Sequence, residues 1–456
     1  MDYKEGRKRL EEERLWVHVI DSKGKIKEDR RRRGKYHISE RINLLLDPGT
    51  WFEYGKFARS PEPGLKNRSQ RDGTMTGFGK INGQTVAIIG DDITVLGGTQ
   101  SLGNVRKVER VLKIAFKKNF PIISLSEGGG LRVPDCMGTG FTRIIGEHDP
   151  VRALAGLANQ TKRPLFICGV FGYCYGDPAL RASSADITIM VEDSAVALSG
   201  PPLLEAAISE KISDIELGGP ELHEIKTGVV DRVVKSEDDC IKMIKDVMHI
   251  LRPPEVPTDP VDRLVPSLES IVPHDNRKVY DMRKVVDQIC DNGEWLELKP
   301  KFGKGLLIGL GRIGGQLVGI VANQPMSAGG SVDARALKKA GSFLDFAILR
   351  RIPLVVLQDV PGFLIGSFVE KEGMVKEVTN YNAILDRVDV PMVSIIIRKA
   401  YGVAYYFLGT TSSGADFVAA WPNTEISFVA PEMGAAILTK HVEPSKKNEE
   451  KKRIME

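Results

Sequence analysis

The sequence lacks any run of apolar residues near the ~20 needed to span a bilayer, and its first residues, MDYKEGRKRLEEERL, lack the apolar segment of a signal peptide. The five cysteines are odd in number and are not spaced as metal ligands, which argues against a disulfide scaffold. None of the seven histidines has a Cys or His neighbour at ligand spacing. We therefore expect a cytoplasmic protein with no metal and no membrane attachment.

The sequence also has little net charge. A balance of +4 over 456 residues is too small for a general nucleic-acid-binding surface. Hydrophobic residues make up 42% and charged residues 27%, which is typical of a globular chain, and the length predicts two domains. The local cluster of Arg30–Arg33 with Lys35 fits either a solvated face or contact with phosphate groups.

Glycine is abundant, with 46 residues, and many glycines recur at a fixed spacing. The stretch GKINGQTVAIIGDD from Gly79 aligns with GRIGGQLVGIVANQ, which starts 232 residues later at Gly311. The same offset places FPIISLSEGGG on IPLVVLQDVPG, and an offset of 230 places Asp186 on Asp416. Chance rarely keeps register over so many Gly, Pro and Asp positions, so the sequence predicts a duplicated domain.

Each copy shows the same expected order of elements: a β-hairpin, a helix, a short apolar strand, a second helix and a second strand. The expected hairpin strands cover 85–90 and 317–323, the first helices 104–118 and 333–350, the first strands 122–125 and 354–357, and the second strands 165–169 and 392–397. This pattern predicts an α/β fold with domains at 1–252 and 275–456. A proline-rich linker at 253–274 joins them.

In each copy the two apolar strands end at glycines, Gly129–Gly130 and Gly172 in the first copy and Gly362 and Gly402 in the second. If the strands are neighbours, backbone N–H groups from two loops converge on one oxygen and stabilise negative charge there. The same glycines could serve only to make tight turns. Their recurrence in both copies favours the functional interpretation.

Several motifs along nearly the whole chain point to one family: RGKYHISERINLLLDPGTWFEYG, DGTMTGFGKING, SEGGGLRV, VGIVANQP, DVPGFLIG, RKAYGVAY and AWPNTEISF. With them the sequence resembles the carboxyltransferase β subunits of biotin-dependent acyl-CoA carboxylases, of the propionyl-CoA and acetyl-CoA type. The resemblance implies two tandem crotonase-like domains, each a ββα superhelix, which agrees with the repeat. It also implies that the first domain binds acyl-CoA and the second holds carboxybiotin.

The resemblance implies a reaction and a set of partners. A separate biotin carboxylase and biotin carboxyl carrier partner would present carboxybiotin, and the carboxyl group would pass to the α-carbon of a short-chain acyl-CoA through a backbone-stabilised enolate. The chain contains no AMKM-type lysine motif, so we do not expect it to carry biotin itself. We expect a homo-oligomer in which the acyl-CoA domain of one chain faces the biotin domain of another.

By this resemblance, the functional positions of the family fall in the glycine-containing loops of both copies. The resemblance implies these catalytic residues: Gly129, Gly130, Gly172, Tyr173, Gly366, Gly402 and Val403. It implies these cofactor-binding residues: Phe363, Gly366, Phe368, Tyr401 and Gly402.

Two of these positions depart from the family pattern. Relatives usually read AGGAxxxPA and RKAYGGAY where this chain reads FGYCYGDPA and RKAYGVAY, so Tyr173 and Val403 replace glycines. If either position needs a positive φ, the new side chain would strain it. The sequence also stops at KKNEEKKRIME where relatives continue, so we expect either a shortened homologue or an incomplete sequence.

Two other functions stay open at this point. One is a biotin-independent acyl-CoA decarboxylase, and the other is a non-catalytic subunit of a carboxylase complex. Biotin independence would identify the first, and failure to bind any acyl-CoA would favour the second. The acyl group itself stays open, because the loop GSFVEKEGM mixes features of several relatives.

Overall fold

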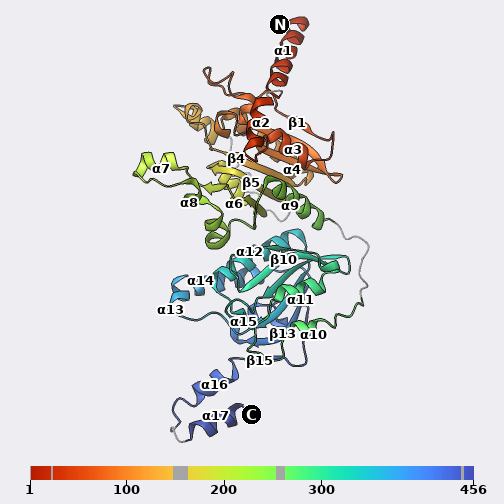
Figure 1. Cartoon of the computed structure of the whole chain (residues 1–456), viewed down its shortest axis with the longest axis vertical. Helices are drawn as coiled ribbons and strands as arrows, with labels where there is room; N and C mark the ends of the chain where they lie inside the picture. The colour runs from red at the N-terminus through yellow and green to blue at the C-terminus, as the bar shows by residue number, and fades with distance from the viewer. Residues whose placement is uncertain (1, 22–23, 147–162, 253–261, 443–445, 456) are drawn as a thin grey trace. The chain divides into compact units, whose positions relative to one another are not determined.

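The computed structural model of the chain describes residues 2–21, 24–146, 163–252, 262–442 and 446–455. The chain divides into two compact units, Met1–His249 and Ile250–Glu456 (Figure 1). Of the predicted linker, residues 253–261 lie outside the described residues, and the remainder contains the short helix α10 (Leu268–Ile271). Within the described residues, no helix has the length and apolar character that crossing a bilayer requires.

The first unit is built on an eight-stranded sheet, counted over its described residues, in the order β1-β2-β3-β4-β5-β6-β8, with β7 paired to β5. The strands are β1 (Phe52–Tyr54), β2 (Thr74–Ile81), β3 (Gln84–Asp91), β4 (Ile122–Gly128), β5 (Phe166–Tyr175), β6 (Ile187–Val191), β7 (Ala195–Ala197) and β8 (Arg232–Val234). The helices are α1 (Tyr3–Asp21), α2 (Gly24–Arg32), α3 (Ile38–Leu45), α4 (Leu102–Lys118), α6 (Asp177–Ser184), α7 (Pro201–Ile208), α8 (Asp214–Gly218) and α9 (Glu237–Ile250).

The second unit has a seven-stranded sheet over its described residues, in the order β14-β13-β12-β11-β10-β9, with β15 paired to β13. The strands are β9 (Trp295–Leu298), β10 (Leu306–Ile313), β11 (Gln316–Asn323), β12 (Leu354–Val360), β13 (Met392–Tyr401), β14 (Phe417–Ala420) and β15 (Glu425–Ser427). Besides α10, the helices are α11 (Met282–Ile289), α12 (Ala334–Arg350), α13 (Ser367–Lys371), α14 (Met374–Leu385), α15 (Gly402–Phe407), α16 (Pro431–Leu438) and α17 (Lys447–Met455).

The two units repeat the same elements, which confirms the predicted duplication. The antiparallel hairpins β2–β3 and β10–β11, the helices α4 and α12, and the strands β4 and β12 all match at the offset of 232. From β3 and β11 onward the central pairs are parallel. All seven residues of β4 are buried, as expected for a parallel strand covered on both faces. The alternating parallel strands and helices confirm the predicted α/β class.

A buried lysine occupies the same place in both units, Lys107 in α4 and Lys339 in α12. The Lys339 Nζ donates to the carbonyls of Lys299 at 2.9 Å and Phe302 at 2.8 Å. Burial lowers the pKa of Lys339 to about 7. Above this pH the folded chain therefore releases a proton that the unfolded chain keeps up to its ordinary lysine pKa of about 10.4.

We predict a pH-dependent stability difference between the protein and its Lys339→Met variant. Because the unfolded state binds more protons between pH 7 and 10, the free energy of unfolding of the parent rises with pH in that window, relative to the variant. Urea denaturation at several pH values measures this difference. The exposed neighbour Lys338, changed to Met, is the control and should give a flat difference. A flat difference for Lys339→Met as well would contradict the prediction.

Candidate active site

The strand ends that the sequence singled out lie side by side in each unit. Parallel pairing of β4 with β5 continues past a register shift to Gly128 opposite Cys174. Pairing of β12 with β13 continues past the same kind of shift to Val360 opposite Ala400. Since paired parallel strands end at the same edge of a sheet, the loops that follow them meet there, as the sequence predicted.

In the first unit the loop after β4 presents one open backbone donor. The Gly129 N–H is engaged, because it donates to the Gly97 carbonyl at 3.1 Å. No described residue accepts a hydrogen bond from the N–H of Gly130, which has φ +76. A Cβ at Gly130 would lie 2.8 Å from the Tyr175 carbonyl oxygen, so only glycine fits here.

The second donor of this unit comes from the start of α6. Gly176 has φ +64 and donates its N–H to the Leu198 carbonyl at 3.1 Å. Asp177 follows as the first residue of α6, and within the described ranges its N–H has no acceptor. Gly130 and Asp177 are therefore open donors on the two neighbouring loops of this unit.

The prediction that Gly172 forms the turn after the second strand is wrong. Gly172 and Tyr173 lie inside β5, which continues to Tyr175 because β7 pairs with its last three residues. In the repeat, the equivalent of Gly402 is Gly176 and not Gly172, because Gly176 and Gly402 each follow the end of a strand and begin a helix. A role in catalysis for Gly172 stays a prediction.

The second unit has open backbone N–H groups at the equivalent strand ends. Gly362, at φ +129, follows β12, and Gly402, at φ +66, opens α15 as predicted. The N–H groups of Gly362 and Val403 have no acceptor within the described ranges, and no side chain caps α15. Gly366 lies further along the same loop at φ +143, against the Phe368 ring.

The condition under which Tyr173 and Val403 would strain the backbone, a positive φ, is not met. Neither residue has a positive φ, because Tyr173 lies in a strand and Val403 in the first turn of a helix. Both side chains are half exposed, and the Tyr173 ring stacks on Tyr175 with centroids 6.5 Å apart. The two departures from the family pattern therefore leave the backbone geometry intact.

We predict that restoring glycine at these two positions does not raise activity. Tyr173→Gly and Val403→Gly remove no strain and add backbone freedom, so turnover should stay the same or fall by a few-fold. Rates of acyl-CoA decarboxylation with the two single variants measure the effect. A tenfold gain in either variant would show that the side chain blocks the site.

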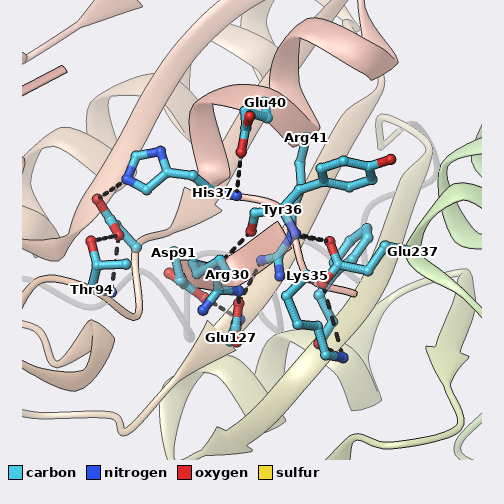
Figure 2. Close-up of polar contacts among 12 residues, drawn as sticks. Arg30, Lys35, Tyr36, His37, Glu40, Arg41, Asp91, Thr94, Glu127 and Glu237 are labelled. Atoms are coloured by element: carbon cyan, nitrogen blue, oxygen red, sulfur yellow. Dashed lines mark hydrogen bonds and ion pairs between the residues drawn. The ribbon is translucent and has the colours of Figure 1, made fainter. Parts of the chain in front are cut away.

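Charged side chains of α2, α3, β4 and α9 form a network that includes Arg30, Arg41, Glu127 and Glu237 (Figure 2). Arg41 of α3 is buried and donates to both carboxylate oxygens of Glu237, at 2.8 and 2.7 Å. Its remaining nitrogen lies 2.6 Å from Glu127, the next-to-last residue of β4, and Arg30 donates to the same carboxylate at 2.8 Å. Two arginines thus neutralise the buried carboxylate that lies two residues before Gly129.

In the second unit, the equivalent buried carboxylate is also neutralised, but by an arginine of a different element. Asp359, the equivalent of Glu127, pairs with Arg398 of β13 at 2.8 Å, and neither side chain is exposed. Arg398 also donates to three carbonyls of the segment 273–278 and lies 4.6 Å from the centre of the Tyr280 ring. In the first unit, the position equivalent to Arg398 is Gly172. Because glycine has no side chain, the Glu127 side chain packs where a Cβ at this position would lie.

The predicted cofactor-binding aromatics lie around the second donor loop. Phe363 packs on Phe407 with ring centroids 5.8 Å apart, while Phe368 is largely exposed. The Tyr401 hydroxyl donates to Glu425 of β15, and the pKa of Tyr401 is raised by burial and by that carboxylate. Binding roles for these residues stay predictions. Within the described ranges, no three His, Cys, Asp or Glu side chains gather as metal ligands.

The chain matches known proteins over most of its length. The family model of the Carboxyl transferase domain matches residues 29–456. The chain is 32% identical to the mitochondrial propionyl-CoA carboxylase beta chain of Homo sapiens, over 90% of this chain and 77% of that protein. It is 31% identical to the propionyl-CoA carboxylase beta chain of Roseobacter denitrificans, over 89% of this chain and 80% of that protein.

A solved structure agrees. The transcarboxylase 12S hexamer with methylmalonyl-coenzyme A and methylmalonic acid bound superposes with a TM-score of 0.87 at 28% identity, over 98% of this chain and 88% of that chain. The fold and the matches define a carboxyltransferase with two crotonase-like units, of the kind found in biotin-dependent acyl-CoA carboxylases. The chain belongs to the Carboxyl transferase domain family.

Proposed function

We propose that this carboxyltransferase moves a carboxyl group between biotin on a partner protein and the α-carbon of a short-chain acyl-CoA. One observation carries the proposal: in each unit, backbone N–H groups without an acceptor among the described residues lie at neighbouring strand ends, Gly130 and Asp177 in the first unit and Gly362 and Val403 in the second. Two donor pairs match a reaction in which charge develops on two oxygens.

On the acyl-CoA side, the first donor pair binds the thioester carbonyl oxygen. Hydrogen bonds from Gly130 and Asp177 strengthen as the carbonyl takes on enolate charge, which lowers the barrier without an acid side chain. The Asp177 carboxylate is held by Gln100 at 3.1 Å and by Arg181 at 3.2 Å. These contacts offset its negative charge close to the developing enolate.

The second donor loop fits the biotin ring system. A Cβ at Gly362 would come no closer than 4.0 Å to any other described residue, the nearest atom being the Tyr401 carbonyl oxygen, so the backbone is open to a ligand. Three apolar side chains on the segments that follow β12 and β13 are exposed to solvent: Ile365, Phe368 and Val403. When bound, biotin supplies the carboxyl group. In this chain the N–H groups of Gly362 and Val403 would hold its ureido oxygen.

The acyl group is proposed from the relatives and from one side chain. Propionyl-CoA carboxylase beta chains and a methylmalonyl-coenzyme A complex of transcarboxylase are among the matches, which supports a short acyl chain. Phe368 is 60% exposed on α13, where its bulk would limit the length of the acyl chain that is accepted.

Apolar helices in both units support the proposed homo-oligomer. The helix α7 buries none of its residues, and its counterpart α16 buries only Ala435. Leu203, Ile208, Ile437 and Leu438 are each at least 59% exposed on these helices. Such apolar faces are typical of surfaces that a second chain covers. We propose that the first unit of one chain faces the second unit of another, and that a biotin carboxylase and carrier protein acts as partner.

The proposal is tested by consumption of malonyl-CoA and methylmalonyl-CoA with purified protein, with and without free biotin. Loss of the carboxyl group that requires biotin is expected, and the relative rates would rank the acyl groups. Equal loss without biotin would favour a decarboxylase. No loss, together with no CoA binding by calorimetry, would favour a non-catalytic subunit.

A further inference from the structure

One buried glutamine connects the two loops that carry the open donors of the first unit. Gln100 lies two residues before α4 and is only 2% exposed. Its backbone N–H donates to the Gly130 carbonyl at 2.8 Å, and its side-chain Nε2 donates to Asp177 Oδ2 at 3.1 Å. Gln100 therefore contacts both residues whose own N–H groups are open.

Gln100 is itself firmly held. Its carbonyl accepts the N–H of Arg132 at 2.7 Å, and the Arg132 guanidinium donates to the fully buried Asp72 at 2.8 Å. The hydroxyl of Ser101, the residue after Gln100, donates to the same carboxylate. Because the segments on both sides of Gln100 are bonded to one buried group, its side chain starts from a fixed backbone.

The Asp177 carboxylate depends on this contact. Its Oδ2 accepts from Gln100 and lies 3.2 Å from Arg181 Nε, while its Oδ1 is buried and accepts no hydrogen bond from any described residue. Arg181 is shared with Asp91, at 2.6 Å. Loss of the Gln100 amide would leave the carboxylate under-satisfied, and such a buried group is costly. The start of α6 would then shift, and the open N–H of Asp177 would move with it.

The second unit keeps the backbone contacts of this arrangement but not the side-chain link. Val332, the equivalent of Gln100, donates its N–H to the Gly362 carbonyl at 3.2 Å and accepts from Leu364 at 2.9 Å. The equivalent of Asp177 is Val403, so neither side chain can form a hydrogen bond. The repeated fold therefore does not require the link, which belongs to the first donor pair alone.

We propose that Gln100 is a positioning residue, which fixes the separation of the Gly130 and Asp177 N–H groups around one oxygen. Both donors stabilise the charge on that oxygen only if each lies at hydrogen-bond distance from it. A displacement of about 1 Å can cost on the order of 100-fold in rate. The inference rests on the proposed function, because it takes the thioester oxygen of acyl-CoA to lie between these two donors.

The first test is kinetic. Gln100→Leu keeps the size of the side chain and both backbone hydrogen bonds and removes only the amide. We expect kcat for methylmalonyl-CoA decarboxylation to fall about 10- to 100-fold, with KM close to that of the parent. Gln316→Leu is the control, because it makes the same change at an exposed glutamine of the second unit, and it should leave kcat unchanged. An unchanged kcat in Gln100→Leu, or a loss confined to KM, would overturn the inference.

A double-mutant cycle tests whether Gln100 acts through Asp177. Asp177→Ala removes the acceptor of the link but keeps the backbone N–H, so we expect a loss in kcat similar to that of Gln100→Leu. The double variant should be no slower than the slower single variant, because both changes break the same contact. Losses that multiply would show that the two side chains act independently, against the inference.

The last test needs no turnover. Infrared spectroscopy of bound propionyl-CoA, labelled with ¹³C at the thioester carbonyl, reports how strongly the donors polarise that bond. We expect the stretch to lie at lower frequency than in free propionyl-CoA with the parent protein, and to shift less with Gln100→Leu. That result together with no biotin-dependent transfer by the parent would retain the inference and refute the proposed function. Equal shifts in parent and variant, or no shift in the parent, would overturn the inference, even where transfer requires biotin.

Discussion

Gly130→Ala is expected to lower carboxyl transfer about 100- to 1,000-fold, the usual loss when one oxyanion donor is removed. The added Cβ would lie 2.8 Å from the Tyr175 carbonyl oxygen, closer than real Cβ atoms come. The loop must therefore shift, and at φ +76 it has no relaxed conformation for alanine. The shift would displace the N–H from the proposed position of the thioester oxygen. The kcat for methylmalonyl-CoA decarboxylation with biotin measures the loss.

Gly138→Ala is the matched control for this variant. Gly138 also has a positive φ, +58, and lies in the same connection after β4, but no atom lies within 4 Å of its added Cβ. The two variants therefore share the backbone strain of about 1–2 kcal/mol and differ in the clash. Comparable losses in both would show that strain in the connection, rather than the position of the Gly130 donor, limits the rate.

Arg398→Met is expected to lower the free energy of unfolding of the second unit by about 3–5 kcal/mol, as is usual when one partner of a buried ion pair is removed. The change leaves the fully buried Asp359 carboxylate with only Lys399, whose Nζ lies 3.7 Å away. It also frees three backbone carbonyls of the segment 273–278. Urea denaturation measures the loss.

The control is a pair of the same chemistry at the surface. Arg351 and Asp389 lie 2.5 Å apart, but both side chains are more than 60% exposed, so Arg351→Met should cost at most about 1 kcal/mol. Adding Asp359→Asn to Arg398→Met should restore part of the lost stability, because it removes the unpaired buried charge. A double variant less stable than the single one would contradict this account of the pair.

The sequence predicted the duplicated α/β fold because its glycines and prolines have fixed conformational roles in both copies. It missed a further part of the repeat, in which YHISERINLLLDPGTW corresponds to YDMRKVVDQICDNGEW. The structure shows the reason for this similarity. Asp47 accepts the N–H groups of Asn82 and Gly83 at the hairpin turn, and Asp291 accepts those of the equivalent turn at 314–315.

The sequence predicted which strand ends lie side by side, but it placed the end of the second strand of the first unit four residues too early. The offset of 230 aligned Gly172 with Gly402, whereas the strands align Tyr175–Gly176 with Tyr401–Gly402. The repeated Tyr-Gly pair was the available signal. Which N–H groups are open could not be predicted, because this depends on distant acceptors such as the Gly97 carbonyl, which engages Gly129.

The buried charges were also beyond sequence reasoning. Glu127 and Asp359 align in the repeat, but their arginine partners come from different elements, Arg41 of α3 and Arg398 of β13. A repeat predicts equivalent partners, and here the two units neutralise carboxylates at equivalent positions with arginines from different elements. Only the three-dimensional packing shows that Gly172 leaves room for the Glu127 side chain in the first unit.

The most direct test of the account follows the carboxyl group itself. Purified protein is incubated with methylmalonyl-CoA labelled in the free carboxyl group and with biotin, and the label is recovered on biotin or as released CO2. We expect acid-labile label on biotin with the parent protein, and almost none with Gly130→Ala. Release of labelled CO2 at the same rate without biotin, and no label on biotin, would contradict it.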